Sequence, residues 1–264
     1  MKKEGGAALT QSVTRALAIL SCFSDQQPEL RVSDFARILG LTQSNVSRLL
    51  STMESLGYVE RDENTGLFRP GLHLVTLAGI ALNQVEIRKQ ALVELQTLES
   101  RLGLGANLAI LKDDHIFYLA HLDGPRAPRM YTLLGRRNPL HATGMGKVLL
   151  AFLPEHEVDA ILARTGLPAY TANTITSDDR LKAQLETIRI RGYGTEREEL
   201  ALGRACVAAP IRSRTGAVVA AISVSGPLTE INLDEREETL ARVVIEAADH
   251  ISVRLGYVAH AYTI

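Results

Sequence analysis

The sequence of 264 residues contains no tryptophan, and its two cysteines, Cys22 and Cys206, lie far apart. This usage excludes a disulfide framework and the paired spacing of a zinc site, and it is typical of a reducing cytosol. No apolar run is long enough to span a membrane. The basic start MKKEGGAALTQSV is not followed by an apolar segment, so no signal peptide is expected. These features predict a cytoplasmic protein without a membrane partner.

The sequence also has no excess of positive or negative charge, because it contains 29 Lys and Arg and 30 Asp and Glu. No basic tail points to nucleic acid, and no charge run points to a membrane surface. What the sequence does have is an ordinary globular composition, with 46% hydrophobic residues. Its length favours two domains. We expect a first domain over 1–71, a helical linker over 72–102 and a second domain over 103–264.

Two short helices with a tight connection are predicted near the start of the chain. Ser33 can cap the helix DFARIL, which ends at Gly40, and Thr42 can cap a second helix that ends near Leu56. The strands YVER and LFRP follow, joined by a turn at residues 64–66. A helix-turn-helix followed by a hairpin is the pattern of a winged DNA-binding domain.

The second of these helices has one apolar stripe and one polar face. The stripe consists of Val46, Leu49, Leu50, Met53 and Leu56. The opposite face is rich in Ser, Asn and Gln with one Arg, the residue types that hydrogen-bond phosphates and base edges. The predicted DNA contacts, on this helix and on the hairpin, are Gln43, Ser44, Asn45, Ser47, Arg48, Ser51, Arg61 and Arg69.

A small helical domain with a merely solvated polar face is the alternative. The charge of the first domain is the main objection to DNA binding, because residues 1–80 hold eight Lys and Arg and eight Asp and Glu. Phosphate contacts dominate affinity for DNA. Binding would therefore need local placement of the arginines and two copies of the domain.

The segment from Leu72 to Leu102 has a helical pattern of apolar residues and ends at Gly103. It is either one long helix or two helices with a joint near Val85. A helical connection transmits motion between domains better than a flexible one.

The pattern changes after Gly103 to short strands and helices. ANLAIL and IFYLAHL are predicted strands around a turn at DD, RMYTLLG is a further candidate, and a hairpin turns at RTG. Helices are predicted over EHEVDAILART, over DDRLKAQLETIRIRG after a cap at Ser177, and from Asp234 to about Leu255. Hairpins with helices outside them predict an α+β domain with one antiparallel sheet and a ligand on one face.

The stretch HATGMGK resembles a nucleotide-binding loop at first sight. A P-loop needs a glycine where this sequence has His141 and Ser or Thr where it has Val148, so the motif fails. A helix that begins here would still offer unpaired backbone N–H groups and a partial positive charge to a small anion or polar ligand. An ordinary glycine turn before a packed helix is the alternative.

Taken together, several stretches make the chain resemble the IclR family of bacterial transcriptional regulators over almost its whole length. They are SVTRALAIL, DFARILGLTQSNVSRLLSTMESLGYVERD, NPLHATGMGKVLLAFLP, RGYGTEREELALGRACVAAPI and AAISVSGP. The resemblance implies an N-terminal winged helix-turn-helix, a helical linker and a GAF-like C-terminal effector domain. It also implies dimers or dimers of dimers that repress or activate catabolic operons, with an organic acid or aromatic catabolite as effector.

The resemblance further implies where the effector binds. Carried over by position, the predicted effector-binding residues are His141, Thr143, Gly144, Met145, Glu196, Ala205, Cys206, Ser223 and Ser225. Relatives that bind small oxoacids have a shorter Asp where this chain has Glu196, so the identity of the effector does not carry over. No cofactor, metal or enzymatic activity is expected.

Alternatives remain open for the same residues. Cys206 could be an enzyme nucleophile with His141 or His121 as its base, or a redox sensor, although Cys22 lies in the other domain. It could also be a structural strand residue. Ser223 and Ser225 could face solvent, and Glu196 could be a surface acid in the loop EREE.

Overall fold

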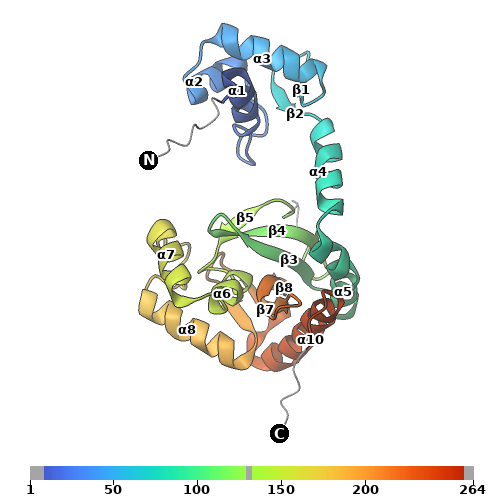
Figure 1. Ribbon diagram of the computed structural model, residues 1–264, viewed down its shortest axis with the longest axis vertical. Coiled ribbons are helices and arrows are strands. Elements are labelled where there is room, and N and C mark those ends of the chain that lie inside the picture. Colours follow the sequence, from blue (N-terminus) through green and yellow to red (C-terminus); the bar gives the residue numbers. More distant parts are fainter. Residues whose placement is uncertain (1–8, 129–132, 259–264) are drawn as a thin grey trace, which may run out of the picture. The chain divides into compact units, whose positions relative to one another are not determined.

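The computed structural model describes residues 9–128 and 133–258 (Figure 1). The chain forms two compact units that divide between Gln84 and Val85, inside the segment predicted as the linker. The three-part division into 1–71, 72–102 and 103–264 stays a prediction. Within the described ranges, no helix has both the length and the apolar character that a membrane span requires.

The first unit is a winged helix-turn-helix, as the sequence predicted. Its elements are α1 (Gln11–Leu20), α2 (Val32–Leu39), α3 (Gln43–Ser55), β1 (Val59–Arg61), β2 (Phe68–Pro70) and α4 (His73–Asn83). The α2 helix ends at Gly40 with a φ of 63°, and the hydroxyl of Thr42 accepts the N–H of Asn45 to begin α3. Ile19, Phe35 and Leu50 are fully buried and join the three helices in one small core.

Two details of this unit differ from the sequence-based prediction. Ser33 does not cap α2, because the helix begins two residues earlier than predicted, at Val32, and the carboxylate of Asp34 accepts the N–H of Arg31 at 3.0 Å. Leu56 is not part of the packed stripe of α3. It lies after the last helical residue and is 61% exposed.

The wing is a two-stranded antiparallel hairpin in which Arg61 pairs with Phe68. Its turn is held by the carboxylate of Asp62, which accepts the N–H groups of Asn64 and Thr65 at 2.9 and 2.8 Å. These hydrogen bonds lower the pKa of Asp62. Gly66 closes the turn with a φ of 71°, a conformation that favours glycine.

The segment predicted to be helical consists of two helices. The second of the two alternatives, with a joint near Val85, is therefore correct. The α4 helix ends at Asn83, and α5 (Glu86–Leu102) begins after Val85, which has an extended conformation. None of the side chains of α4 is buried, whereas α5 buries Ala91, Leu95 and Leu98 in the second unit.

The second unit is built on a six-stranded antiparallel sheet with the order β5-β4-β3-β8-β7-β6. Its strands are β3 (Gly105–Lys112), β4 (His115–Leu122), β5 (Arg137–Pro139), β6 (Gly194–Arg197), β7 (Arg204–Arg212) and β8 (Val218–Pro227). Its helices after α5 are α6 (Gly144–Ala151), α7 (Glu155–Thr165), α8 (Asp178–Arg191), α9 (Leu228–Ile231) and α10 (Leu233–Arg254). The α5 and α10 helices cover one face, and α6, α7 and α8 cover the other (Figure 1). The predicted fold class is therefore confirmed.

Several features of this unit differ from the sequence-based prediction. The candidate strand RMYTLLG falls largely on 129–132, which lie outside the described residues, and its last three residues form no strand. The edge strands β5 and β6 were missed because they are short and polar, without an apolar alternation. Ser177 precedes α8, but its side chain makes no capping hydrogen bond.

Successive side chains of β8 point to opposite faces of the sheet. Ile222 and Val224 point into the core under α5 and α10. Ser223 and Ser225 point to the other face, where they are only 1% and 8% exposed. The serines are thus buried under the α6 layer, which excludes the alternative that they face solvent.

Candidate functional site

Strand register brings the polar residues of the second unit together in two rows across the sheet. In one row Glu196 pairs with Cys206, and Cys206 pairs with Ser225. In the next row Ser223 pairs with Asn107, and Asn107 pairs with His121. Directly paired residues project from the same face of a sheet. Five strands therefore supply one polar patch, although its members are up to 118 residues apart in sequence.

The N-terminus of α6 lies over this patch. The hydroxyl of Thr143 accepts the N–H of Gly146 at 3.1 Å, which fixes the start of the helix. A Cβ atom on Gly144 would lie 2.6 Å from the Cys206 sulfur, and one on Gly146 would lie 2.2 Å from the carbonyl oxygen of Leu140. Both glycines thus permit close approach of the helix to the sheet and to the chain before it.

A cavity of about 270 Å³ lies between α6 and the sheet. Eight of the nine predicted effector residues line it, namely Thr143, Gly144, Met145, Glu196, Ala205, Cys206, Ser223 and Ser225. Sequence reasoning missed eight other lining residues, which are Asn107, Tyr118, Leu133, Arg136, Asn138, Leu200, Ala201 and Arg204. A polar Asn107 in the apolar strand ANLAIL was the one signal that could have pointed to it.

His141 does not line the cavity. Its Nε2 atom lies 3.0 Å from the carbonyl oxygen of Pro168, and its ring packs against Tyr170. Burial lowers its pKa. The residue that begins the HATGMGK stretch thus holds the chain at 168–170 beside the start of α6.

The cavity combines positive groups with one unusual acid. Arg136, Arg204 and the N-terminus of α6 contribute positive charge or potential. Glu196 is buried, and its Oε1 atom accepts the N–H groups of Glu199 at 2.6 Å and Leu200 at 3.2 Å. Burial raises the pKa of Glu196 to about 7, against the lowering effect of those two hydrogen bonds. Glu196 is therefore no surface acid, and it can be neutral near physiological pH.

The thiol of Cys206 is poorly suited to nucleophilic or redox chemistry. Burial, and then the charge of Glu196, raise its pKa well above the usual range. The thiolate is the reactive form of cysteine. Cys206 is partly exposed, but toward the cavity that it lines. Among the described residues, no group of three or more His, Cys, Asp or Glu side chains could hold a metal ion.

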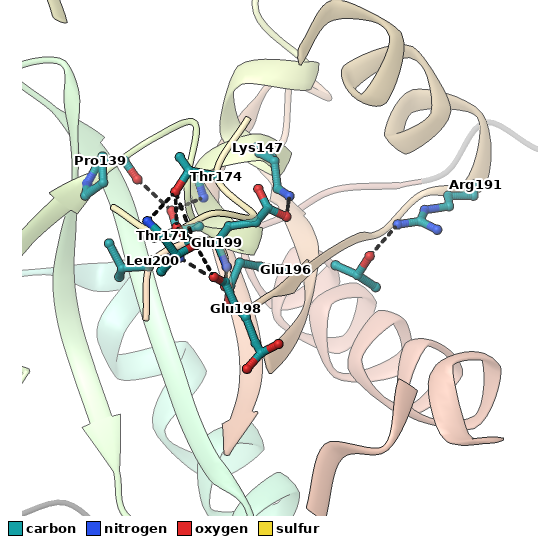
Figure 2. A network of polar contacts seen from close by, with 12 residues as sticks. Pro139, Lys147, Thr171, Thr174, Arg191, Glu196, Glu198, Glu199 and Leu200 are labelled. Atoms are coloured by element: carbon teal, nitrogen blue, oxygen red, sulfur yellow. Dashed lines mark hydrogen bonds and ion pairs between the residues drawn. The ribbon is translucent and has the colours of Figure 1, made fainter. Parts of the chain in front are cut away.

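The wall of the cavity at 198–203 is held by a buried polar network (Figure 2). Lys147 of α6, fully buried, donates to Glu199 at 2.5 Å. The hydroxyls of Thr171 and Thr174 donate to the backbone carbonyls of Glu198 and Glu199, each at 2.6 Å. The network joins α6 and the 171–174 turn to the strand end that carries Glu196.

The predicted DNA contacts of the first unit lie on one surface of α3 and on the wing. Ser44, Ser47, Arg48 and Ser51 are exposed, as the polar face requires. The guanidinium of Arg48 donates to the side-chain oxygen of Asn45 at 2.6 Å, so one helical turn orients it.

The two wing arginines differ in their surroundings. Arg69 donates to the carboxylate of Glu60 through Nε and Nη2, at 3.1 and 3.0 Å. Arg61 lies over the ring of Phe68, 5.6 Å from its centroid. Within the part of the chain that the structure describes, no acid forms an ion pair with Arg61.

Two protein-family models match the chain. One is described as the IclR helix-turn-helix domain and matches residues 12–63, and the other is described as the bacterial transcriptional regulator IclR C-terminal and matches residues 79–253. The regulator XynR of Escherichia coli strain K12 is 34% identical over 251 residues, which are 95% of this chain and 99% of the relative.

Solved structures show the same likeness. The IclR protein of Thermotoga maritima has a TM-score of 0.77 at 31% identity, covering 93% of this chain and 99% of the other. An IclR homolog of Microbacterium hydrocarbonoxydans, complexed with 4-hydroxybenzoate, has a TM-score of 0.80 at 27% identity, covering 92% and 98%.

Proposed function

Because the chain belongs to the IclR family of bacterial transcriptional regulators, we propose that it binds a pseudo-palindromic operator as a dimer or dimer of dimers. A small carboxylic acid from a catabolic pathway, either an organic acid or an aromatic catabolite, enters the cavity of the second unit and alters operator binding. The observation that carries this proposal is the cavity under the N-terminus of α6, with Arg136 and Arg204 in its lining.

The ligand class follows from the charges in the cavity. Guanidinium groups and helix N-termini both favour a carboxylate. A neutral Glu196 adds a possible hydrogen-bond donor and removes a repulsive charge. The structural relative that contains 4-hydroxybenzoate, which is itself a carboxylic acid, supports the same class.

A thermal-shift screen tests the effector proposal. Catabolic acids, sugar acids and aromatic acids would be compared with their neutral amides. A ligand at about 100 times its dissociation constant stabilises a folded protein by roughly 2.7 kcal/mol. Hits would then be added to an operator-binding assay. A panel in which no acid stabilises the chain or changes operator binding would contradict the proposal.

The proposed dimer is supported by apolar surface on the first unit. Val13 and Leu17 of α1 are 55% and 60% exposed, and Val75 and Ile80 of α4 are 66% and 57% exposed. The α4 helix contains no charged residue. These faces fit a second copy of the chain, and two copies supply the phosphate contacts that one neutral domain lacks. Half-sites would then lie about one helical turn, or a multiple of it, apart.

Arg48 is the residue proposed to read bases from α3. Replacing Arg48 by alanine is expected to cost about 1–3 kcal/mol of operator binding and to relax specificity at one position of each half-site. A competition assay over single-base operator variants measures both effects. A uniform loss over all sequences would instead identify a phosphate contact, and unchanged binding would remove α3 from the groove.

The two wing arginines are expected to differ in their contribution to phosphate binding. Replacing Arg61 by alanine should lower the slope of log affinity against log salt by roughly one. Replacing Arg69 should lower it less, because Glu60 already offsets its charge. Titrations at several salt concentrations measure the slopes. If neither variant changes the slope, the wing does not contact the backbone of DNA.

Glu196 is expected to make stability depend on pH. Its folded pKa of about 7 lies above its usual value of 4.5, so the folded chain holds a proton that the unfolded chain releases between these values. Stability therefore falls as pH rises through this window. Replacing Glu196 by glutamine should remove that loss, which amounts to at most about 3 kcal/mol at pH 8. Urea unfolding at pH 5 and pH 8 measures the difference, and an equal effect at both values would contradict it.

A further inference from the structure

A chain of hydrogen bonds runs from the surface of the second unit to the serines of the cavity. Nε2 of His121 lies 3.0 Å from the carboxylate of Asp123, and Nδ1 lies 2.8 Å from the side-chain oxygen of Asn107. The amide nitrogen of Asn107 donates to the hydroxyl oxygens of Ser223 and Ser225, both at 3.1 Å. Asn107 is 2% exposed, and the side chain of His121 is 5% exposed.

The contacts of His121 with Asp123 and Asn107 place an acceptor at each ring nitrogen. A carboxylate oxygen and an amide oxygen both accept hydrogen bonds, so both short contacts are satisfied only when both ring nitrogens carry a proton. A neutral ring can donate from one nitrogen alone. If the neutral ring keeps its proton on Nε2 and donates it to Asp123, Nδ1 is an acceptor. Asn107 must then rotate its amide group so that the amide nitrogen donates to Nδ1.

The orientation of Asn107 in turn sets the role of Ser223. When the amide nitrogen faces the serines, Ser223 accepts from it and keeps its own hydrogen for a ligand that accepts. When the amide oxygen faces the serines, the Ser223 hydroxyl donates to that oxygen and presents only lone pairs to the cavity. Protonation of His121 therefore makes the Ser223 hydroxyl a donor to the ligand, and loss of that proton makes it an acceptor.

We propose that Asp123, His121 and Asn107 determine the specificity of the cavity, because they present Ser223 as a donor to a carboxylate when His121 is protonated. Carboxylate binding is then coupled to uptake of one proton at His121. The inference rests on the proposed effector site and names a device that regulates it. His121 and Asp123 lie behind Asn107 and are positioning residues.

Other charged groups near this chain are part of the electrostatic balance. Arg88 of α5 donates to the carbonyl of Leu119 on β4, and the side chain of Arg126 packs against Gly103 just before β3. Arg136, Arg204 and Glu196 line the cavity around the serines. Glu196 titrates near pH 7, so the test is made in a Glu196→Gln background, where its proton is absent.

The experiment compares acetate with acetamide as probes on the full chain carrying Glu196→Gln. Acetate and acetamide have nearly the same shape and differ in charge. Dissociation constants are measured by isothermal titration from pH 5.5 to pH 9. Acetate binding should weaken by about tenfold for each pH unit above the midpoint of His121, whereas acetamide binding should stay flat. Ring ¹⁵N spectra of His121 should show its midpoint rise when acetate binds.

Three further variants separate positioning from a merely structural role. Asp123→Asn, at a position that is 44% exposed, should move the midpoint of acetate binding to lower pH without loss of folding. His121→Gln should bind acetate with no dependence on pH, because an amide nitrogen donates to Asn107 at every pH. Asn107→Leu should remove the preference for acetate over acetamide.

The outcomes separate this inference from the proposed function. Acetate binding that is absent, independent of pH, or unaltered by both Asp123→Asn and His121→Gln would overturn the inference. If acids from the screen still release the operator in that case, the effector site stands and only the His121 device is wrong. If no ligand of either charge alters operator binding, the proposed function itself fails.

Discussion

Replacing Lys147 by methionine is expected to destabilise the second unit by about 3–5 kcal/mol. Lys147 is fully buried in α6 and is bound to Glu199, whose side chain is 8% exposed. Methionine fills a similar volume but leaves the carboxylate of Glu199 buried without its cation. Removing one partner of a buried ion pair costs this much because the remaining charge is uncompensated. Urea unfolding followed by circular dichroism measures the loss.

The matched control is the double variant with Lys147→Met and Glu199→Gln. Because it removes both charges together, it should recover much of the lost stability. The single variant should also weaken effector binding, since Glu199 holds the wall that carries Leu200 at the cavity. If the double variant is no more stable than the single one, the volume of the lysine chain matters here and the ion pair does not.

Replacing Ser225 by leucine is expected to abolish the response to effector and to leave operator binding by the free protein nearly intact. Ser225 is 8% exposed and lines the cavity. A leucine there fills the space of the ligand and removes the hydroxyl that Asn107 contacts. An effector acts only if it binds the DNA-competent and DNA-incompetent arrangements with different affinity. A filled cavity removes that difference.

Operator titrations with and without the effector measure this result. Ser225→Ala is the matched control, because it removes the same hydroxyl and keeps the cavity open. It should retain a response, shifted to higher effector concentrations. Loss of operator binding together with the response in Ser225→Leu would mean that cavity and DNA-reading unit are not separable. A full response in that variant would place the effector elsewhere.

The joint between α4 and α5 divides the helical segment that was predicted between Leu72 and Leu102. Val85 has an extended conformation between the two helices. The sequence left open whether the segment is one helix or two. The structure decides for two helices because α5 buries one face in the core of the second unit, whereas α4 buries no side chain.

Local signals in the sequence determined most of the elements and the fold class, but not the short edge strands β5 and β6. Thr42 and Gly40 mark the turn between α2 and α3, and the alternation of Ser223 with Ile222 predicts a strand with two unlike faces. These signals act over a few residues, so they can be read without a fold. These signals mislead where neighbouring residues can fill the same role. Ser33 was expected to cap α2, but the carboxylate of Asp34 makes the capping hydrogen bond instead.

Only the tertiary structure added Asn107, Arg136 and Arg204 to the cavity residues that the sequence had predicted. Asn107, Arg136 and Arg204 come from three separate segments, and strand register together with the path of the chain beyond β4 brings them to Ser223. Burial also changes the acid–base properties of side chains in the second unit. It raises the pKa of Glu196 to about 7 and raises the pKa of the Cys206 thiol, whereas His141 lies outside the cavity with its Nε2 atom 3.0 Å from the carbonyl oxygen of Pro168. Desolvation and long-range pairing depend on neighbours that are distant in sequence, and no local pattern of residues contains them.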